Sequence, residues 1–510
     1  MRRLMRLVFP GVLVLGVLAG AAGATHNADR HAKMDLVSVN PKPAINSDLA
    51  FWGKHAFSGY YRGDRSEGGF RIFDISNPAS PQLLRDFPCD GPQNDPIVWD
   101  RNGNGIADLL LLAVDRTMSG PECGAPRAAH ADPNGWEGVR VLELSDNPAN
   151  PFASIQQVAA VYQDCGAHTI TLYPGLADAG KLIVYVSSYP LRPGPTCGQV
   201  NGPAAGRDPL HGVIQVIEVP LANPAASKEI AEAPINYPGD PDNKIDWCER
   251  NLCAPGVLEP AAKACHDIVV HMDRHIAGGA CAEQGQVWRI GANGIPDTAN
   301  PISIVDDKVS SGGTGNIPGA VDFFHSVMFS NDGRVLNTVD ESFGDGCPPF
   351  TEWQPRPWNP AGGVHKTGKM FFSNTTTGTF YSEFQVGDLR PEPGAYCSAH
   401  MGMAVMNTGR DLLVNAWYMG GVDVIDFSKP RRPREVAYYD MAPPGATGSD
   451  NWSAYPYAGP RFKTGRGMPV YASDGVHNPD TARGFVVFRA HIPKTGVGRL
   501  ENHLNPQTME

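Results

Sequence analysis

The stretch that decides the fold is GGFRIFDISNPASP, at residues 68–81. Two glycines open it, apolar residues then alternate with other residues, and an Asn-Pro pair follows. Alternation with a period of two gives a strand one apolar face, and Asn-Pro favours a turn. The stretch therefore predicts a β-strand that ends directly in a turn.

Related stretches recur along the chain, beginning at Glu137, His211, Gln284, Thr377, Gly420 and Arg483. A second apolar run precedes most of them, such as LAFWG at 49–53 and ADLLLLAV at 107–114. A further run precedes that one, and another often follows the proline, as in REVAYYD at 434–440. Four short antiparallel strands per repeat, in seven repeats, predict an all-β fold, a seven-bladed β-propeller.

Composition sets the limits of the domain. Residues 1–24 carry a basic start, an apolar stretch and Ala22-Gly23-Ala24, the pattern of a secretory signal peptide. We expect an N-terminal segment at 25–33, a single propeller domain at 34–495 and a C-terminal tail at 496–510. MDLVSVN, at 34–40, would supply the outer strand of the last blade and close the ring. No later stretch reaches the roughly 18 apolar residues of a membrane span, so we expect a secreted, extracellular protein.

The chain is acidic, with a formal net charge of -11. Removal of the signal takes away three arginines and brings the charge to about -14. An acidic surface repels phosphate backbones, so we expect no nucleic-acid partner.

The ten cysteines all follow the signal. An even number in an exported chain favours disulfides. Most of them fall either just before a first strand or in a loop between a second and a third strand, which places them on one face of the ring. The predicted pairs are Cys89–Cys123, Cys165–Cys197, Cys265–Cys281, Cys347–Cys397 and Cys248–Cys253.

Four histidines fall at one repeat position, each opening a first run: His168, His266, His325 and His400. The first strand of each blade lines the channel of a propeller, so these imidazoles should meet at the channel mouth. Imidazole suits copper, iron and zinc, and the set predicts a transition-metal site. The alternative is that these side chains are hydrogen-bonded fillers of a wet channel. The ring is partial, because blade two offers Asn94 and the last blade Asn451 or Trp452 instead.

Other polar residues lie close to the predicted mouth. Asp340 and Glu341 end the second run of the fifth repeat and would serve as acceptors for an imidazole N–H or as a general base. The simpler interpretation, which we prefer at this stage, is a pair of solvated loop acids. His55 and His477 are expected on the rim, and His503 in a disordered end.

A second cation site is predicted in DRNGNGIAD, at 100–108. Its oxygen-bearing residues have the spacing of a calcium loop, and Gly105 permits the sharp turn. The ligands would be Asp100, Asn102, Asn104 and Asp108. The alternative is an Asn-Gly hairpin turn, which the same residues would form. Either role is structural.

The phrase from Gly68 resembles the LVIVD-repeat family of predicted secreted β-propellers, most closely at 68–88 and 420–440. That resemblance implies a propeller and no defined reaction. His266-Asp267-Ile268 is also similar to the His-Asp-Ile that opens a blade in the selenium-binding protein and methanethiol oxidase propellers. That similarity extends over a few residues.

Two functions follow from these patterns. The first is an exported metal-binding scaffold whose partner is an unknown small molecule or a surface partner. The second is a copper- or iron-dependent oxidase or oxygenase that uses the channel histidines. The sequence contains no nucleophile elbow, phosphate loop, dinucleotide fingerprint or zinc-protease motif.

Overall fold

The computed structural model describes residues 28–62, 67–129, 132, 134–163, 165–188, 212–236, 264–282, 284–306, 315–318, 321, 323–341, 368–389, 397–442, 448–458, 467–492 and 502–510. The predicted signal peptide at 1–24 lies outside these residues. So do residues 189–210 and 343–366. Within the part of the chain that is described, no helix has the length and apolar character needed to cross a membrane.

The chain folds into groups of four antiparallel strands that follow one another in sequence. The first groups are β3 (Ile45–Trp52), β4 (His55–Tyr61), β5 (Gly68–Asp74) and β6 (Gln82–Pro88); β7 (Gln93–Trp99), β8 (Leu109–Met118), β9 (Trp136–Leu144) and β10 (Ile155–Tyr162); and β11 (Thr169–Tyr173), β12 (Lys181–Ser187), β13 (Val213–Pro220) and β14 (Lys228–Pro234). The next are β15 (Asp267–His271), β16 (Ile276–Cys281), β17 (Gln284–Arg289) and β18 (Ser303–Asp306), then β19 (Phe324–Phe329), β20 (Val335–Asp340), β21 (Met370–Asn374) and β22 (Phe380–Phe384).

The last groups share one sheet, in which β23 and β27 pair in parallel at Met401 and Ser453. This sheet contains β23 (Ala399–Ala404), β24 (Leu412–Trp417), β25 (Gly421–Asp426), β26 (Arg434–Asp440), β27 (Asn451–Pro456), β28 (Met468–Asp474) and β29 (Gly484–Ala490). The outer positions are taken by β1 (Arg30–Ala32) on β26 and by β2 (Met34–Asn40) on β29. As the sequence predicts, MDLVSVN therefore provides the outer strand beside β29.

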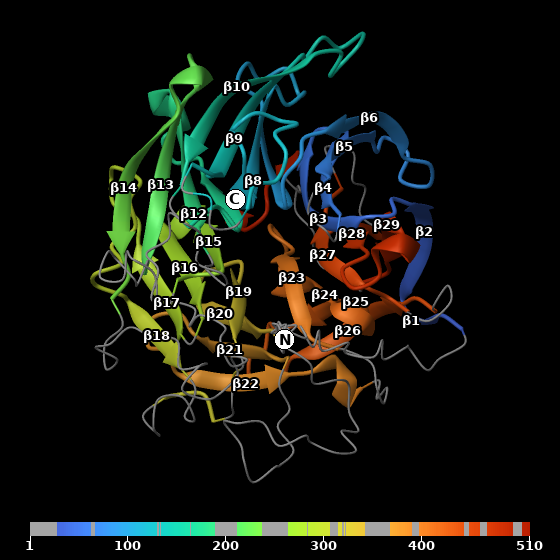
Figure 1. Ribbon diagram of the computed structural model, residues 1–510. Helices are drawn as coiled ribbons and strands as arrows, with labels where there is room; N and C mark the ends of the chain where they lie inside the picture. The colour runs from blue at the N-terminus through green and yellow to red at the C-terminus, as the bar shows by residue number, and fades with distance from the viewer. Residues whose placement is uncertain are drawn as a thin grey trace, which may run out of the picture.

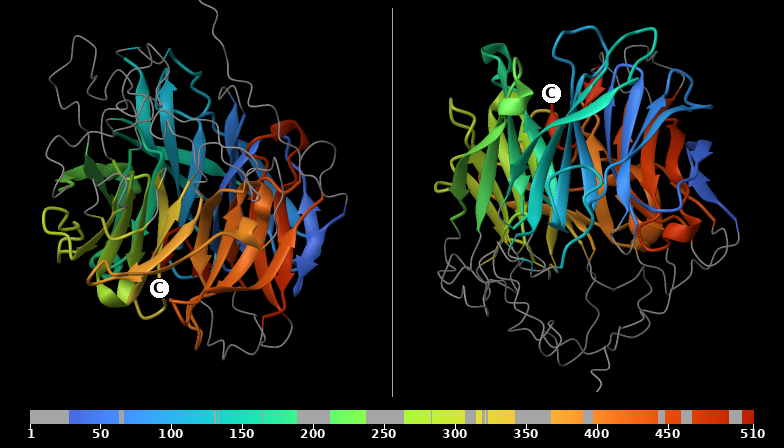
Figure 2. Two further views of the ribbon diagram at one scale, coloured as in Figure 1. Left: turned by 90° about the horizontal axis from the view of Figure 1, so that it is seen from below. Right: turned by 45° about the horizontal axis from the view of Figure 1, so that its top comes forward.

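These groups stand around a central channel as the blades of a β-propeller (Figure 1). The first strand of each group faces the channel, and β6, β10, β14, β18, β22, β26 and β2 lie at the rim (Figure 1). The two turned views show the strands running roughly parallel to the channel axis (Figure 2). Short 3₁₀ turns interrupt the loops at Ala177–Ala179, Pro224–Ala226, Met272–Arg274, Val386–Asp388, Tyr418–Gly420 and Pro479–Thr481.

Apolar side chains fill the space between neighbouring blades. Leu109 and Leu111 of β8 belong to the same buried cluster as Leu172 of β11 and Val184 of β12. Both faces of a middle strand pack against another blade, so the apolar run of β8 is nearly continuous and all of its residues are buried. Fully burying one such aliphatic side chain contributes about 1.5–3 kcal/mol.

The strand order in the first repeat differs from the prediction. LAFWG falls in β3, the first strand, and the second strand is β4, HAFSGYY. The first half of β3 carries Asn46, Ser47 and Asp48, which are buried although they are polar. Because these residues are polar, the strand lacks the apolar alternation on which the prediction was based. The fifth repeat also differs from the prediction. Its third strand is β21, and the stretch from Thr377, which was grouped with the one from Gly68, forms the outer strand β22.

The C-terminal residues form an ordered plug, whereas the sequence predicts a tail. β30 (His503–Leu504) pairs with β3, and β31 (Thr508–Met509) pairs in parallel with β15. Met509 is fully buried, and the Thr508 hydroxyl donates to the carbonyl of Leu172 at 2.8 Å. The C-terminus consequently lies inside the ring (Figure 1). His503 stacks on Trp52 with 4.4 Å between ring centroids, so it is not in a disordered end.

Two predicted disulfides are present, Cys89–Cys123 and Cys265–Cys281. Cys165 and Cys397 are also disulfide-bonded. The partners predicted for them, Cys197 and Cys347, lie outside the described residues. The same holds for the predicted pair Cys248–Cys253.

Candidate metal centre

The four repeated histidines meet in the channel at the start of adjacent first strands. His168 and His266 directly precede β11 and β15, while His325 and His400 are the second residues of β19 and β23. Each is at most 8% exposed. Hydroxyl groups fix the register between neighbouring blades at this level. Thr169 donates to the carbonyl of His266 at 2.6 Å, and Ser326 to the carbonyl of His400 at 2.8 Å.

The imidazole rings form a continuous arc through four blades. The ring centroids lie 4.3 Å apart for His168 and His266, 3.7 Å for His266 and His325, and 4.0 Å for His325 and His400. The structure thus brings together all four residues that the sequence singled out.

Glu341 completes a tight set with two of the histidines. Among the described residues, the ligand atoms that lie within 4.8 Å of one another belong to His325, Glu341 and His400. Ligands about 2.0–2.2 Å from one ion can be no more than about 4.4 Å apart, so this spacing is close to that of a coordination shell. One Glu341 oxygen lies 3.8 Å from Nε2 of His325.

The hydrogen bonds leave one ring nitrogen of His400 and one of His325 free to bind a metal ion. Nδ1 of His400 donates to the carbonyl of Trp452, which leaves Nε2 as a lone-pair donor. A metal-bound histidine usually donates its other ring nitrogen in this way. Nδ1 of His325 is buried and has no hydrogen-bond partner within the described residues. An unpaired buried polar atom is costly, and a bound ligand is one physical reason for it.

Burial sets the protonation of these groups. It lowers the pKa of His400 to about 3, and it lowers the pKa values of His266 and His325 well below their usual value. The imidazoles of His266, His325 and His400 are therefore neutral at pH 7, which is the form that binds metals. Burial also raises the pKa of Glu341 to about 7, while its hydrogen bond to Tyr418 opposes that shift.

The other end of the arc is a hydrogen-bonded pair. Nε2 of His168 lies 2.7 Å from Nε2 of His266, and Nδ1 of His168 lies 2.7 Å from an Asp115 oxygen. Asp115 also accepts from Arg116 at 2.7 Å. This carboxylate orients the His168 ring and, through it, the ring of His266.

Sequence analysis named Glu341 as a possible acceptor or base but preferred a solvated acid, and it did not single out Tyr418. Glu341 is 9% exposed, so the expectation of a solvated loop acid is wrong. Its oxygen accepts from the Tyr418 hydroxyl, and the Tyr418 ring lies 4.6 Å from His400 and 4.8 Å from His477. His477 pairs with Asp450 at 2.7 Å. Only its position along the chain could have pointed to Tyr418, because it follows the end of β24 just as Glu341 follows the end of β20.

Two neighbouring expectations are corrected as well. Asp340 is fully buried, and its two oxygens accept from the N–H groups of Phe323 and Gly368. It therefore holds the loop backbone. His55 is fully buried at the start of β4 and packs edge-on to Phe152, so it is not a rim residue.

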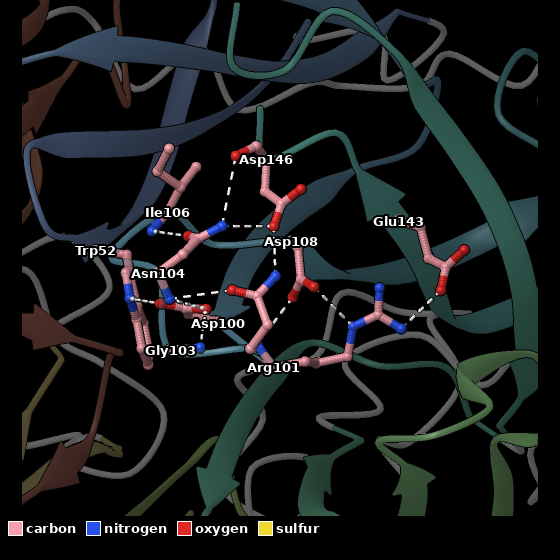
Figure 3. A network of polar contacts seen from close by, with 10 residues as sticks. Trp52, Asp100, Arg101, Gly103, Asn104, Ile106, Asp108, Glu143 and Asp146 are labelled. Atoms are coloured by element: carbon pink, nitrogen blue, oxygen red, sulfur yellow. Dashed lines mark hydrogen bonds and ion pairs between the residues drawn. The ribbon is translucent and has the colours of Figure 1, made fainter. Parts of the chain in front are cut away.

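The predicted calcium loop is a closed hydrogen-bond network (Figure 3). Asp100 accepts from the N–H groups of Gly103 and Gly105 at 2.8 and 2.7 Å and from the indole of Trp52 at 3.3 Å. Asp108 pairs with Arg101 at 3.1 Å.

Asp146, which sequence analysis did not include, faces the same loop. Its carboxylate accepts from the side-chain amides of Asn102 and Asn104 (Figure 3). Protein groups thus already satisfy the oxygens, which favours the hairpin-turn interpretation of this segment, although Asp146 adds a carboxylate that a cation could use.

No family model and no curated protein matches the chain. The resemblances to the LVIVD-repeat family and to selenium-binding protein therefore stay predictions from the residues quoted above.

Among solved structures, the chain is similar to Sqt1 from Chaetomium thermophilum, in a crystal structure with the N-terminus of ribosomal protein L10 bound and in a second crystal structure of Sqt1. In each case the identity is 12%, the coverage is 89% of this chain and 90% of that chain, and the TM-score is 0.43. A TM-score of this size supports no inference about function.

Proposed function

We propose that the protein is an exported, seven-bladed propeller that binds a transition-metal ion at the channel mouth. Four-stranded groups around one channel support the blade count, with β2 completing the group of β27 to β29. The observation that carries metal binding is the set of His325, Glu341 and His400, whose ligand atoms lie within 4.8 Å of one another. The signal-peptide pattern at 1–24 and the disulfides support export.

The donor set favours iron or zinc over calcium, because nitrogen ligands suit transition metals. Two histidines and one carboxylate would occupy three coordination positions of the metal ion and leave its other positions open. His266 lies against His325 and is the natural fourth ligand. Asp115 and His168 then orient His266, as carboxylate–histidine pairs do beside many metal ions.

Oxidase or oxygenase activity is the second candidate. A two-histidine, one-carboxylate set with open positions is the ligand arrangement of non-haem iron oxygenases. Tyr418 stands beside this set, hydrogen-bonded to Glu341 and packed on His400. Its hydroxyl can hold a proton at the carboxylate edge of the site.

Metal analysis of the purified protein tests the proposal. We expect about one equivalent of iron, zinc or copper after loading and dialysis, lost by at least tenfold in a His325→Ala, His400→Ala variant. His271→Ala is the matched control, because His271 is also buried in a first strand but lies at the opposite end of β15. Equal metal content in the two variants would refute the site.

Nitric oxide separates the two candidates. It binds Fe(II) only where coordination positions are open, and it gives a characteristic electron paramagnetic resonance signal. The oxygenase candidate requires this signal in the iron-loaded protein. An iron-loaded protein that lacks the signal would reject the oxygenase candidate and leave the metal-binding scaffold.

A structural calcium ion in the 100–108 loop is a separate proposal, supported by Asp100, Asn104 and Asp146 around one turn. Calcium should raise the melting temperature of the native protein and leave that of an Asp146→Ala variant unchanged. An equal rise in both would exclude Asp146 as a ligand.

A further inference from the structure

A buried guanidinium lies against one sulfur of the Cys89–Cys123 disulfide. Nη1 of Arg140, a residue of β9, donates to Sγ of Cys89 at 3.3 Å. Arg140 and Cys89 are both 0% exposed. The same guanidinium donates to the carbonyl of Asp90 and, through Nε, to the carbonyl of Pro121 at 2.9 Å. A positive charge is therefore fixed beside the Cys89 sulfur in the protein interior.

This positive charge has no counter-ion while the disulfide is intact. Within the described residues, no carboxylate forms an ion pair with Arg140, and its Nη2 is buried without a hydrogen-bond partner. Burial lowers the pKa of Arg140 to about 10, and the more distant carboxylates of Asp90 and Glu122 oppose that shift. A buried charge without a partner is costly, so a negative charge formed on Cys89 is stabilised at this position.

The two sulfur-bearing residues differ in their access to solvent. Cys89 belongs to a fully buried apolar cluster that includes Phe70 and Leu112. Cys123 is only half-buried, in the loop that follows β8. A thiol in solution therefore reaches Cys123 before Cys89.

Contacts other than the disulfide hold the two cysteines together. The N–H of Cys123 donates to Oε1 of Gln157 at 2.7 Å, and the Gln157 amide donates to the carbonyl of Pro121 at 2.9 Å. Arg140 donates to this same carbonyl while it contacts Cys89. The loop therefore stays beside Cys89 when the S–S bond is broken, and the bond can form again.

We propose that Cys89–Cys123 is a redox-active disulfide that exchanges with an external dithiol. A thiolate of the dithiol attacks Sγ of Cys123, the S–S bond breaks, and its electron pair leaves on Sγ of Cys89 as a thiolate beside Arg140. The second sulfur of the dithiol, once deprotonated, displaces Cys123, which takes up a proton.

The balance of this exchange is complete. The dithiol is oxidised to a disulfide, the protein gains two electrons, and one proton is released to solvent. A leaving sulfur whose thiolate is stabilised leaves faster, and Arg140 provides that stabilisation. The site is independent of metal binding by the channel histidines.

Equilibration of the purified protein with dithiothreitol, at graded ratios of its reduced to its oxidised form, tests the proposal. N-ethylmaleimide traps the free thiols, and mass spectrometry of peptides quantifies each pair. Cys265–Cys281 is the internal control, because both cysteines are at most 1% exposed and no described Arg or Lys side chain donates to either sulfur. We expect Cys89–Cys123 to be half-reduced at a ratio at least tenfold lower, a difference of about 30 mV.

Two variants separate the charge from the packing. Arg140→Met removes the charge and keeps a long unbranched side chain. It should raise the half-reduction ratio of Cys89–Cys123 at least tenfold and leave that of Cys265–Cys281 unchanged. Arg140→Lys keeps a positive charge and should stay closer to the native protein than Arg140→Met does.

If the variants fail to fold, the native protein decides the question. Brief exposure to glutathione, stopped with acid, should place the mixed disulfide on Cys123. This measurement needs no substitution and reports which sulfur is attacked.

Three results would overturn the proposal. The two disulfides could be half-reduced at the same ratio. A folded Arg140→Met variant could keep the native ratio, which would give the arginine a purely structural role. Glutathione could also attach to Cys89 or to neither cysteine, which would contradict the order of attack.

Discussion

Asn505 offers the sharpest test of the C-terminal plug. Its side chain makes both hydrogen bonds of one backbone unit in β7: Oδ1 accepts from the N–H of Val98 at 2.8 Å, and Nδ2 donates to the carbonyl of Val98 at 2.9 Å. Asn505 is 1% exposed and Val98 is fully buried, so water cannot replace the amide. Truncation to alanine leaves two buried backbone groups unpaired.

An unpaired buried polar group costs about 1–3 kcal/mol, so Asn505→Ala should lower the free energy of unfolding by about 2–4 kcal/mol. The measurement is urea unfolding followed by tryptophan fluorescence. Asn502→Ala is the matched control, because its exposed side chain lies in the same segment, and it should stay within about 0.5 kcal/mol of the native protein. Equal stability of the two variants would show that the plug is not docked in solution.

Three further outcomes are expected. Burial lowers the pKa of His55 to about 4, so its unfolded form binds more protons between pH 6.5 and 4. Stability should fall by up to about 3 kcal/mol as pH drops through that window, and His55→Leu should flatten the fall in pH-dependent unfolding; an unchanged slope would contradict this. Cys89→Ser with Cys123→Ser opens a loop with a sequence separation of 34 and should cost about 2–4 kcal/mol in the same assay, whereas no loss would mean that the pair is reduced. Asp100→Ala frees the N–H groups of a turn and should cost about 1–3 kcal/mol without added calcium; a neutral result would show that the network of Figure 3 is not formed.

The sequence predicts the strands wherever a strand carries apolar alternation. The stretch from Gly68 became β5, and MDLVSVN became the outer strand β2. Prediction failed where polar residues line the channel. Asn46 to Asp48 interrupt the alternation of β3, which shifted the first repeat by one strand.

The histidines could be found because one repeat position recurs in space as well as in sequence. Tyr418 could not be found, since it follows the end of a second strand and only three-dimensional closure brings it to the channel. Glu341 was a candidate, but the sequence did not show that its side chain is buried. The C-terminal plug was missed for a related reason. Its burial depends on hydrogen bonds from Asn505 and Thr508 to other blades, and such bonds leave no pattern along the chain.

The most direct test of the metal centre is anomalous X-ray diffraction from crystals loaded with iron or zinc, recorded at the absorption edge of the metal. We predict one strong peak at the channel mouth, about 2.0–2.2 Å from a nitrogen of His325, a nitrogen of His400 and an oxygen of Glu341. A fully loaded crystal with no peak between these three side chains would contradict the account.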